Sequence, residues 1–184
     1  MSKAYVFLAD GFEEIEALTV VDLFRRAKID TVTVSISDSL EMIGRSRISV
    51  KADKMFEDCN FADASCLILP GGMPGTTYLG RHAGLCNLLK NAAEDKKVYL
   101  GAICAAPTVF GKLGILKGKK ATCYPGMENE LTGAKVVTDK KVVKDGKVIT
   151  SRGMGTAIPF GIRLIEVLKG EECAKDIERS IVFG

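Results

Sequence analysis

The fold class follows from the segment Val98-Tyr99-Leu100-Gly101-Ala102-Ile103-Cys104-Ala105-Ala106-Pro107. Its first six residues predict a buried strand, and a helix is expected from Ala105 onwards. Small residues lie two positions before and two positions after the thiol of Cys104, as the tight strand-to-helix turn of a nucleophile elbow requires. Pro107 suits the first turn of a helix. The segment therefore predicts an α/β protein with a reactive cysteine at the end of a strand.

Strands and helices alternate outward from this segment. The predicted strands cover residues 3–9, 31–37, 66–69, 98–103 and 120–123, then a hairpin of 141–143 and 147–150 around Lys144-Asp145-Gly146. The predicted helices start near Glu13, near Leu85, at Ala105 and near Gly155, and residues 41–51 form an excursion or an extra hairpin. Apolar central strands between helices predict an open, flavodoxin-like, mostly parallel sheet with helices on both faces. We expect one domain over residues 1–184.

Composition and charge exclude several classes of protein. Hydrophobic residues make up 47% of the 184, which is enough for a core, and the net charge of +3 is too weak to indicate a nucleic-acid partner. No apolar run approaches the roughly 20 residues of a membrane-spanning helix. The N-terminal segment lacks the long apolar region of a signal peptide, so we expect a cytoplasmic protein that does not bind membranes.

The cysteines do not predict disulfides or a metal site. The six are Cys59, Cys66, Cys86, Cys104, Cys123 and Cys173, and His82 is the only histidine. No two of the cysteines have C-x-x-C spacing, so a zinc site of the usual Cys/His type is not expected. Five of the six have no assigned role, and no cofactor is expected.

Two glycines form the second candidate piece of the site. Leu69-Pro70-Gly71-Gly72 ends a predicted strand, and glycines permit backbone shapes that point amide hydrogens into a site. With the amide of Ala105, such amides could form an oxyanion hole. A thiol at a helix N-terminus also feels the positive end of the helix dipole, which favours the thiolate of Cys104.

A carboxyl group is the third candidate piece. Acidic residues in a first helical turn are usually solvated, but Glu16 lies next to the apolar stripe at Ala17 and could lean towards the end of the sheet. A buried carboxyl there would have a raised pKa, and it could exchange a proton with the thiol. Ser151-Arg152-Gly153-Met154-Gly155-Thr156 is a glycine-rich helix entry that could bind an anion; it is too short for a dinucleotide fingerprint.

Taken together, these pieces resemble the ThiJ/PfpI family, and within it the parkinsonism-associated deglycase branch, which is glyoxalase III-like. The resemblance covers essentially the whole chain and implies a fold like that of the class I glutamine amidotransferases. It rests on Gly11 through Glu16, Leu69-Pro70-Gly71-Gly72, Ala102-Ile103-Cys104-Ala105, Lys144-Asp145-Gly146 and Ser151-Arg152-Gly153, in this order.

The resemblance implies roles for single residues. Cys104 matches the family's reactive, oxidation-prone cysteine, Glu16 the glutamic acid bonded to it, and Gly72 and Ala105 the oxyanion amides. Arg26 and Arg47 match arginines near an anion site at a homodimer interface, so a homodimer is expected. Further candidates for contact with a substrate or anion are Gly71, Tyr124 and Ser151. No metal ligand is implied.

Three functional hypotheses remain open. The first is an enzyme that detoxifies reactive carbonyls, converting methylglyoxal to lactate or removing early glycation adducts, through a Cys104 hemithioacetal with Glu16 as acid and base. The second is a redox sensor or protective interaction protein that uses oxidation of Cys104. The third is a small-substrate amidase or peptidase. It is disfavoured because Tyr124 stands where many relatives carry a histidine.

Overall fold

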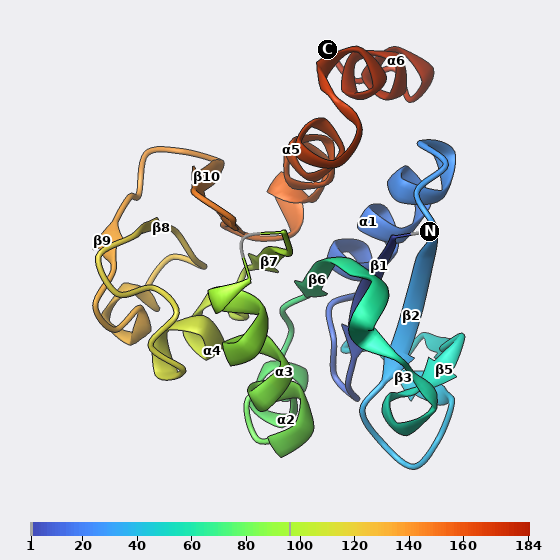
Figure 1. The fold of residues 1–184 in the computed structure, drawn as a ribbon, viewed down its shortest axis with the longest axis vertical. Coiled ribbons are helices and arrows are strands. Elements are labelled where there is room, and N and C mark those ends of the chain that lie inside the picture. Colours follow the sequence, from blue (N-terminus) through green and yellow to red (C-terminus); the bar gives the residue numbers. More distant parts are fainter. Residues whose placement is uncertain (1, 96) are drawn as a thin grey trace.

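A central seven-stranded sheet lies between two layers of helices in the computed structural model, which describes residues 2–95 and 97–184 (Figure 1). The strands are β1 (Lys3–Leu8), β2 (Thr31–Ser35), β3 (Glu41–Ile43), β4 (Ser49–Lys51), β5 (Lys54–Met55), β6 (Ala64–Leu69), β7 (Tyr99–Ile103), β8 (Lys120–Ala121), β9 (Lys135–Val136), β10 (Val142–Asp145) and β11 (Val148–Ser151). The helices are α1 (Glu14–Arg26), α2 (Gly75–Leu79), α3 (Ala83–Glu94), α4 (Pro107–Lys112), α5 (Ala157–Lys169) and α6 (Glu171–Ser180).

The strand order of the large sheet is β10-β11-β7-β6-β1-β2-β5. All neighbours pair in parallel except β10, which pairs antiparallel with β11 through the predicted hairpin. The predicted flavodoxin-like, mostly parallel sheet is confirmed. In such a sheet the carboxyl ends of β1, β6, β7 and β11 lie along one edge, where open α/β sheets bind ligands.

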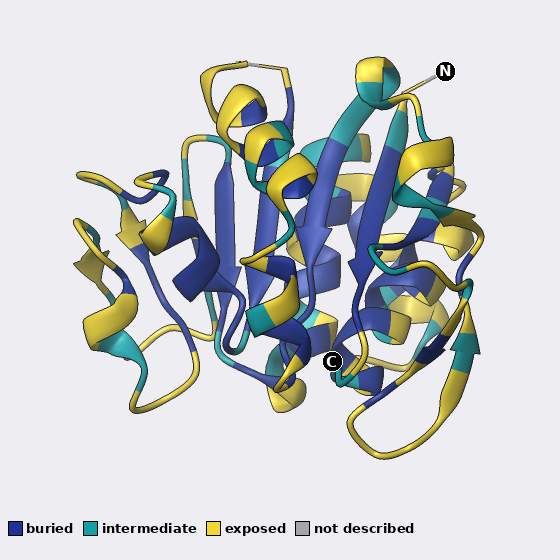
Figure 2. Cartoon of the chain, turned by 90° about the horizontal axis from the view of Figure 1, so that it is seen from below, coloured by how far each residue is buried: buried dark blue, intermediate teal, exposed yellow. Residues whose placement is uncertain are grey.

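Alternation along the strands divides the core into two layers. In β1, Ala4, Val6 and Leu8 face the cluster that contains α1, α5 and α6, whereas Tyr5 and Phe7 face the cluster with α2, α3 and α4. Successive side chains of a strand point to opposite faces, so an apolar strand supplies both layers. Figure 2 shows the strands buried between the helices, whose outer surfaces are exposed.

The structure differs from the predicted strands in one instructive place. Residues 120–123 were expected to form a strand, but β8 ends at Ala121. The next backbone amides bind other groups: Thr122 N donates to Thr150 Oγ1 (2.9 Å), and Tyr124 N donates to the carbonyl of Cys104 (2.8 Å). After Ala121 the chain therefore leaves its pairing with β9 and runs beside the turn at Cys104. The hairpin of β3 and β4 matches the predicted excursion over residues 41–51.

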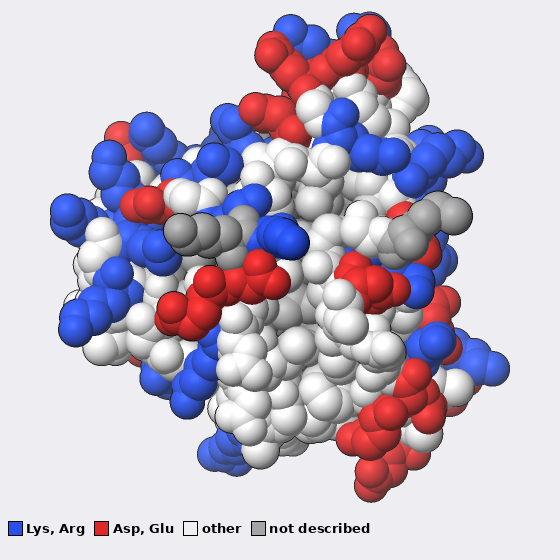
Figure 3. Space-filling model, in the orientation of Figure 1, with Lys and Arg blue, Asp and Glu red and all other residues white. Residues whose placement is uncertain are grey.

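Charged side chains of both signs lie around a broad uncharged area of the face in Figure 3. Lys and Arg are frequent on the side that carries β8, β9 and β10, Asp and Glu side chains lie among them, and acidic side chains gather over α6 (Figure 3). Within the described residues, no helix has the length and apolar character needed to cross a membrane. The absence of nucleic-acid and membrane partners, the cytoplasmic location and the single domain over 1–184 remain predictions.

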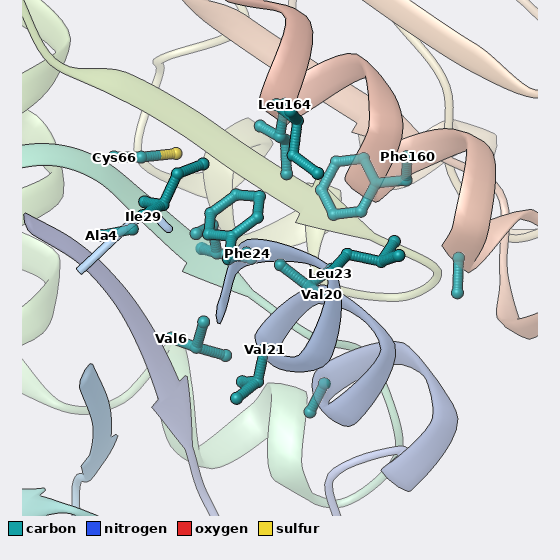
Figure 4. Close-up of a cluster of buried hydrophobic side chains, with 14 of the residues drawn as sticks. Ala4, Val6, Val20, Val21, Leu23, Phe24, Ile29, Cys66, Phe160 and Leu164 are labelled. Atoms are coloured by element: carbon teal, nitrogen blue, oxygen red, sulfur yellow. The ribbon is translucent and has the colours of Figure 1, made fainter. Parts of the chain in front are cut away.

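The packing of α1 against α5 should govern stability. Phe24 and Phe160 are fully buried and lie with Leu23 and Leu164 in one cluster between the two helices and the sheet (Figure 4). We predict that Phe160→Ala lowers the free energy of unfolding by about 3–5 kcal/mol, because it removes a large buried side chain and leaves a cavity. Urea titration measures the change. Val182→Ala is the control, since Val182 is 94% exposed, and an equal loss in both variants would contradict the prediction.

Candidate active site

Cys104 sits on a strained turn directly after β7. Its φ of 64° lies in the left-handed region, which residues other than glycine adopt uncommonly and at some cost in strain. Two backbone hydrogen bonds hold the turn: Cys104 N donates to the Ser151 carbonyl (3.0 Å), and the Cys104 carbonyl accepts from Tyr124 N (2.8 Å). α4 begins three residues later. The half-buried thiol is therefore held at the carboxyl edge of the sheet, as an elbow nucleophile would be.

The loop between β6 and α2 passes so close to Cys104 that Gly71 has no room for a side chain. A Cβ on Gly71 would lie 2.6 Å from the Cβ of Cys104 and 2.7 Å from Oε2 of Glu16. Gly72 has a φ of 91°, and a Cβ there would meet Glu13 N at 2.4 Å. Both glycines are thus required by close backbone approach and, at Gly72, by a positive φ.

Glu16 brings a carboxyl group to the thiol from the first turn of α1. It is 1% exposed, and its Oε2 accepts a hydrogen bond from Gly71 N at 2.9 Å. Its Oε1 is also buried and has no hydrogen-bond partner among the described residues. A buried oxygen without a partner is rare, and here it belongs to a group next to a thiol.

Burial decides the pKa of both groups. Burial raises the pKa of Glu16 to about 7, although its hydrogen bonds to Cys104 and Gly71 act in the opposite direction. Burial, together with the charge of the Glu16 carboxylate and the hydrogen bond to it, raises the pKa of the Cys104 thiol to about 12. Burial and the Glu16 carboxylate therefore outweigh the thiolate-favouring effect expected from the helix N-terminus.

Two backbone amides favour the thiolate. Hydrogen bonds from the amides of Ala105 and Gly72 lower the pKa of Cys104. Both contributions that Glu16 makes to raising that pKa require an ionised carboxylate, so they vanish when Glu16 is protonated. A protonated Glu16 can instead donate to a thiolate. The pair can thus hold one proton on either the oxygen or the sulfur, beside two amides that stabilise negative charge.

Tyr124 and the loop after β11 lie beside this pair. A Cβ on Gly153 would lie 3.4 Å from the ring of Tyr124 and 4.0 Å from Oε1 of Glu16. Tyr124 is 51% exposed, so its ring is open to solvent at the rim of the site. Ser151 is fully buried, and its hydroxyl is bonded to the Lys141 carbonyl and to Thr156. Contact of Tyr124 or Ser151 with a substrate remains a prediction.

The two predicted arginines are not gathered around Cys104 within one chain. Arg26 pairs with Asp22 at 2.7 Å at the other end of α1, about 15 Å along the helix from Glu16. Arg47 lies in the exposed turn between β3 and β4 with a φ of 65°. Their roles at an anion site remain predictions.

A neighbouring residue, Arg45, was missed by the sequence reasoning. Burial raises the pKa of Glu16, and the charge of Arg45 acts against this rise; Arg45 N donates to the Phe12 carbonyl at 2.8 Å.

Glu14 was also missed: it is 5% exposed, and its Oε1 accepts from Ser46 N at 2.8 Å. Glu14 thereby fixes the β3–β4 hairpin against α1. No hydrophobic periodicity in the sequence predicts that Glu14 is buried. It lies among acidic residues, which are normally exposed at the start of a helix.

The remaining thiols and the acidic groups bear on a possible metal site. Within residues 2–95 and 97–184, no group of three or more His, Cys, Asp or Glu side chains is close enough to hold a metal ion. All six cysteines are free. Burial raises the pKa of Cys59, Cys66, Cys86 and Cys123.

The raised pKa of Glu16 predicts an unusual dependence of stability on pH. The unfolded carboxyl loses its proton near pH 4.5, whereas the folded one keeps it to about pH 7. The folded state binds more protons between these values, so its stability falls as pH rises from 4.5 to 7, by up to about 3 kcal/mol. Urea titrations of wild type and Glu16→Gln across this range test this. The variant should lack this fall, and parallel curves for the two proteins would disprove it.

Comparison with known proteins places the chain and its fold in one family. The family model described as "DJ-1/PfpI family" matches residues 2–167. Protein DJ-1 homolog B of Arabidopsis thaliana is 39% identical over 166 residues, which cover 90% of this chain. Those residues cover 37% of the Arabidopsis protein, so the chain spans little more than a third of its length.

Two further relatives match from end to end. Protein dj-1beta of Drosophila melanogaster is 38% identical over 187 residues, covering 100% of this chain and 99% of that protein. The solved structure "Toxoplasma gondii DJ-1, oxidized" has a TM-score of 0.94 and 33% identity, and the match covers 100% of both chains. The family model and these identities over whole chains show that the chain belongs to the DJ-1/PfpI family.

Proposed function

We propose that the protein is a thiol enzyme that converts small reactive carbonyls such as methylglyoxal to hydroxy acids. The observation that carries this proposal is the buried pair of Cys104 and Glu16, with the Glu16 pKa raised to about 7. A general acid and base works best when its pKa lies near the working pH. The amides of Gly72 and Ala105 lie at the sulfur, where an oxyanion would form.

The proposed reaction balances without a cofactor. The sulfur of Cys104 attacks the aldehyde carbon of methylglyoxal, and the aldehyde oxygen takes up the thiol proton, which gives a hemithioacetal. Glu16 takes the proton from that carbon and returns it to the neighbouring carbonyl carbon through an enediol. The hydroxyl proton of the first carbon passes to the oxygen of the second, which leaves a thioester of lactate. Water then hydrolyses the thioester to lactate and the free thiol. Removal of an early glycation adduct would begin with the same attack of the thiol.

Each residue of the site would serve one of these steps. The Gly72 and Ala105 amides would stabilise the negative oxygen that forms during attack and hydrolysis. The unpartnered Oε1 of Glu16 is the oxygen left to accept the substrate proton, since Oε2 is held by Gly71 N. The exposed ring of Tyr124 would form the rim that contacts the substrate.

A second candidate function is redox sensing at Cys104. The Toxoplasma relative was solved in a form that its title calls oxidized. In this chain, the Glu16 carboxyl and two backbone amides act on the sulfur, and with Glu16 protonated they could hold the oxygens of a sulfinate. The third hypothesis, a peptidase or amidase, has less support. His82, the only histidine of the sequence, caps α3 and packs its ring against Phe56 at 4.6 Å.

A homodimer is the assembly that the surface supports. Apolar side chains that are at least about one-third exposed gather on the outside of α1 and on the neighbouring β3–β4 hairpin: Ile15, Leu18, Ile43 and Ile48. Contiguous exposed apolar groups on a folded protein mark an interaction surface. Arg26 and Arg47 lie on the same two elements, which fits the proposed anion site between two copies.

Lactate formation is the first test of the enzyme proposal. Wild-type protein should convert methylglyoxal to lactate without glutathione or added metal. Cys104→Ala should abolish this activity, because no other thiol lies at the oxyanion amides. Cys86→Ala is the matched control and should keep full activity. No lactate from wild type would reject the enzyme and favour the redox role, which peroxide titration of Cys104 with mass spectrometry would then examine.

The role of Glu16 is tested by its isosteric amide. Glu16→Gln should keep the fold, because its side-chain oxygen can still accept from Gly71 N. It should lower kcat by at least about 100-fold, since an amide cannot shuttle a proton. Steady-state lactate assays and circular dichroism together give the answer. Unchanged turnover in a folded variant would remove Glu16 from the mechanism.

The homodimer is tested at the apolar surface. Sedimentation should give twice the chain mass for wild type, and Ile15→Asp should shift the protein towards the monomer because a charge would be buried in the contact. Val136→Asp is the control, since Val136 is 41% exposed on β9 and lies away from α1. A monomer mass for wild type would disprove the dimer.

A further inference from the structure

A cavity opens between α2 and α4, next to the loop that carries the oxyanion amides. Its volume is about 290 Å³, and its lining includes Thr76, Arg81, Thr108 and Lys112. Met73 and Met127 add apolar surface. The cavity is at the small end of the range for ligand sites, so it fits a small ion or a single head group.

The wall of this cavity is bonded to both oxyanion residues. Thr76 N donates to the Gly72 carbonyl at 2.9 Å. The Thr108 hydroxyl donates to the Ala105 carbonyl at 2.8 Å. A ligand that ordered Thr76 and Thr108 would therefore also order the two peptide segments whose amides lie at the Cys104 sulfur.

One polar group in the wall has no partner. Thr76 is 4% exposed, and its hydroxyl is buried without a hydrogen bond among the described residues. A buried hydroxyl normally finds a partner, because leaving it unpaired is costly. Thr108 shows the usual arrangement one helix away, where the hydroxyl binds a backbone carbonyl. The Thr76 hydroxyl therefore keeps an unused donor at the wall of the cavity.

The charge around the cavity favours an anion. Arg81 forms no ion pair with any described carboxylate, not even with Asp10, which lines the adjoining hollow on the other side of Arg81. Lys112 pairs with Glu130 at 3.2 Å, but its side chain is 66% exposed, so the pair is weak. The lining carries two cations and one carboxylate, and Arg81 is the charge left unmatched.

We propose that this cavity binds a phosphate-type anion, with the Thr76 hydroxyl as its buried donor and Arg81 as its charge partner. A phosphate offers several acceptor oxygens to a guanidinium fork and a hydroxyl at once. The anion is either free phosphate or the phosphate of a phosphorylated aldehyde that reacts at Cys104. The second source rests on the proposed function, whereas binding itself does not.

Binding is tested with inorganic phosphate and the full chain. Amide signals of Thr76, Arg81 and their neighbours in ¹⁵N-resolved NMR should shift saturably with sodium phosphate, against sodium chloride at equal ionic strength. Thr76→Val keeps the shape of the side chain and should weaken the affinity roughly tenfold, as loss of a hydrogen bond to a charged group does. Arg81→Met should weaken it at least as much.

Matched controls separate the site from general charge effects. Thr138→Val and Arg163→Met change exposed residues away from the cavity and should leave the affinity unchanged. The proposal is overturned if phosphate causes no saturable shift in wild type, or if the control variants weaken binding as much as Thr76→Val and Arg81→Met do.

Turnover distinguishes the two sources of phosphate. KM is measured for D-glyceraldehyde and for D-glyceraldehyde 3-phosphate with wild type and Arg81→Met. A rise in KM for the phosphorylated aldehyde alone assigns the cavity to the substrate. If KM changes equally for the two aldehydes, and wild type binds inorganic phosphate, the cavity is assigned to free phosphate. Absence of turnover with intact phosphate binding would reject the proposed enzyme and leave the binding site standing.

Discussion

The hydrogen bond from Gly71 N to Oε2 of Glu16 is the contact on which the site depends. It joins the start of α1 to the loop after β6, and it leaves the second oxygen of Glu16 buried without a partner among the described residues. Burial of this carboxyl costs stability unless it takes up a proton. The fold therefore keeps a proton next to Cys104 near neutral pH. The chemistry of the site follows from where that proton is held.

The same arrangement explains why the thiol and the carboxyl cannot be considered separately. Burial raises the pKa of Cys104 most, the Glu16 carboxylate raises it further, and the amides of Gly72 and Ala105 lower it. The charge state of Glu16 thus changes the reactivity of the sulfur. Groups coupled in this way lose their protons as a pair, and the pair has two apparent pKa values. A nucleophile with an acid in contact is suited to reactions in which a proton moves between adjacent atoms.

Much of the fold could be predicted from the sequence, because apolar runs and turn residues mark strands locally. The parallel sheet and the hairpin of β10 and β11 follow from such runs and from Asp145-Gly146. The end of β8 could not be predicted from local sequence. The amides of Thr122 and Tyr124 donate to Thr150 and Cys104, which are distant in sequence. The elbow at Cys104 was visible in its small neighbours. Arg45 and the buried state of Glu14 were not, because they depend on how the β3–β4 hairpin docks on α1.

The positive φ of Cys104 has a consequence for the evolution of the chain. Glycine is the residue that adopts this conformation without strain, so a chain selected for stability alone would carry glycine at position 104. The proposed nucleophile at position 104 therefore costs some stability, because it keeps a reactive group in a conformation that glycine adopts more freely. Glycine at position 104 would relieve this cost and remove the thiol.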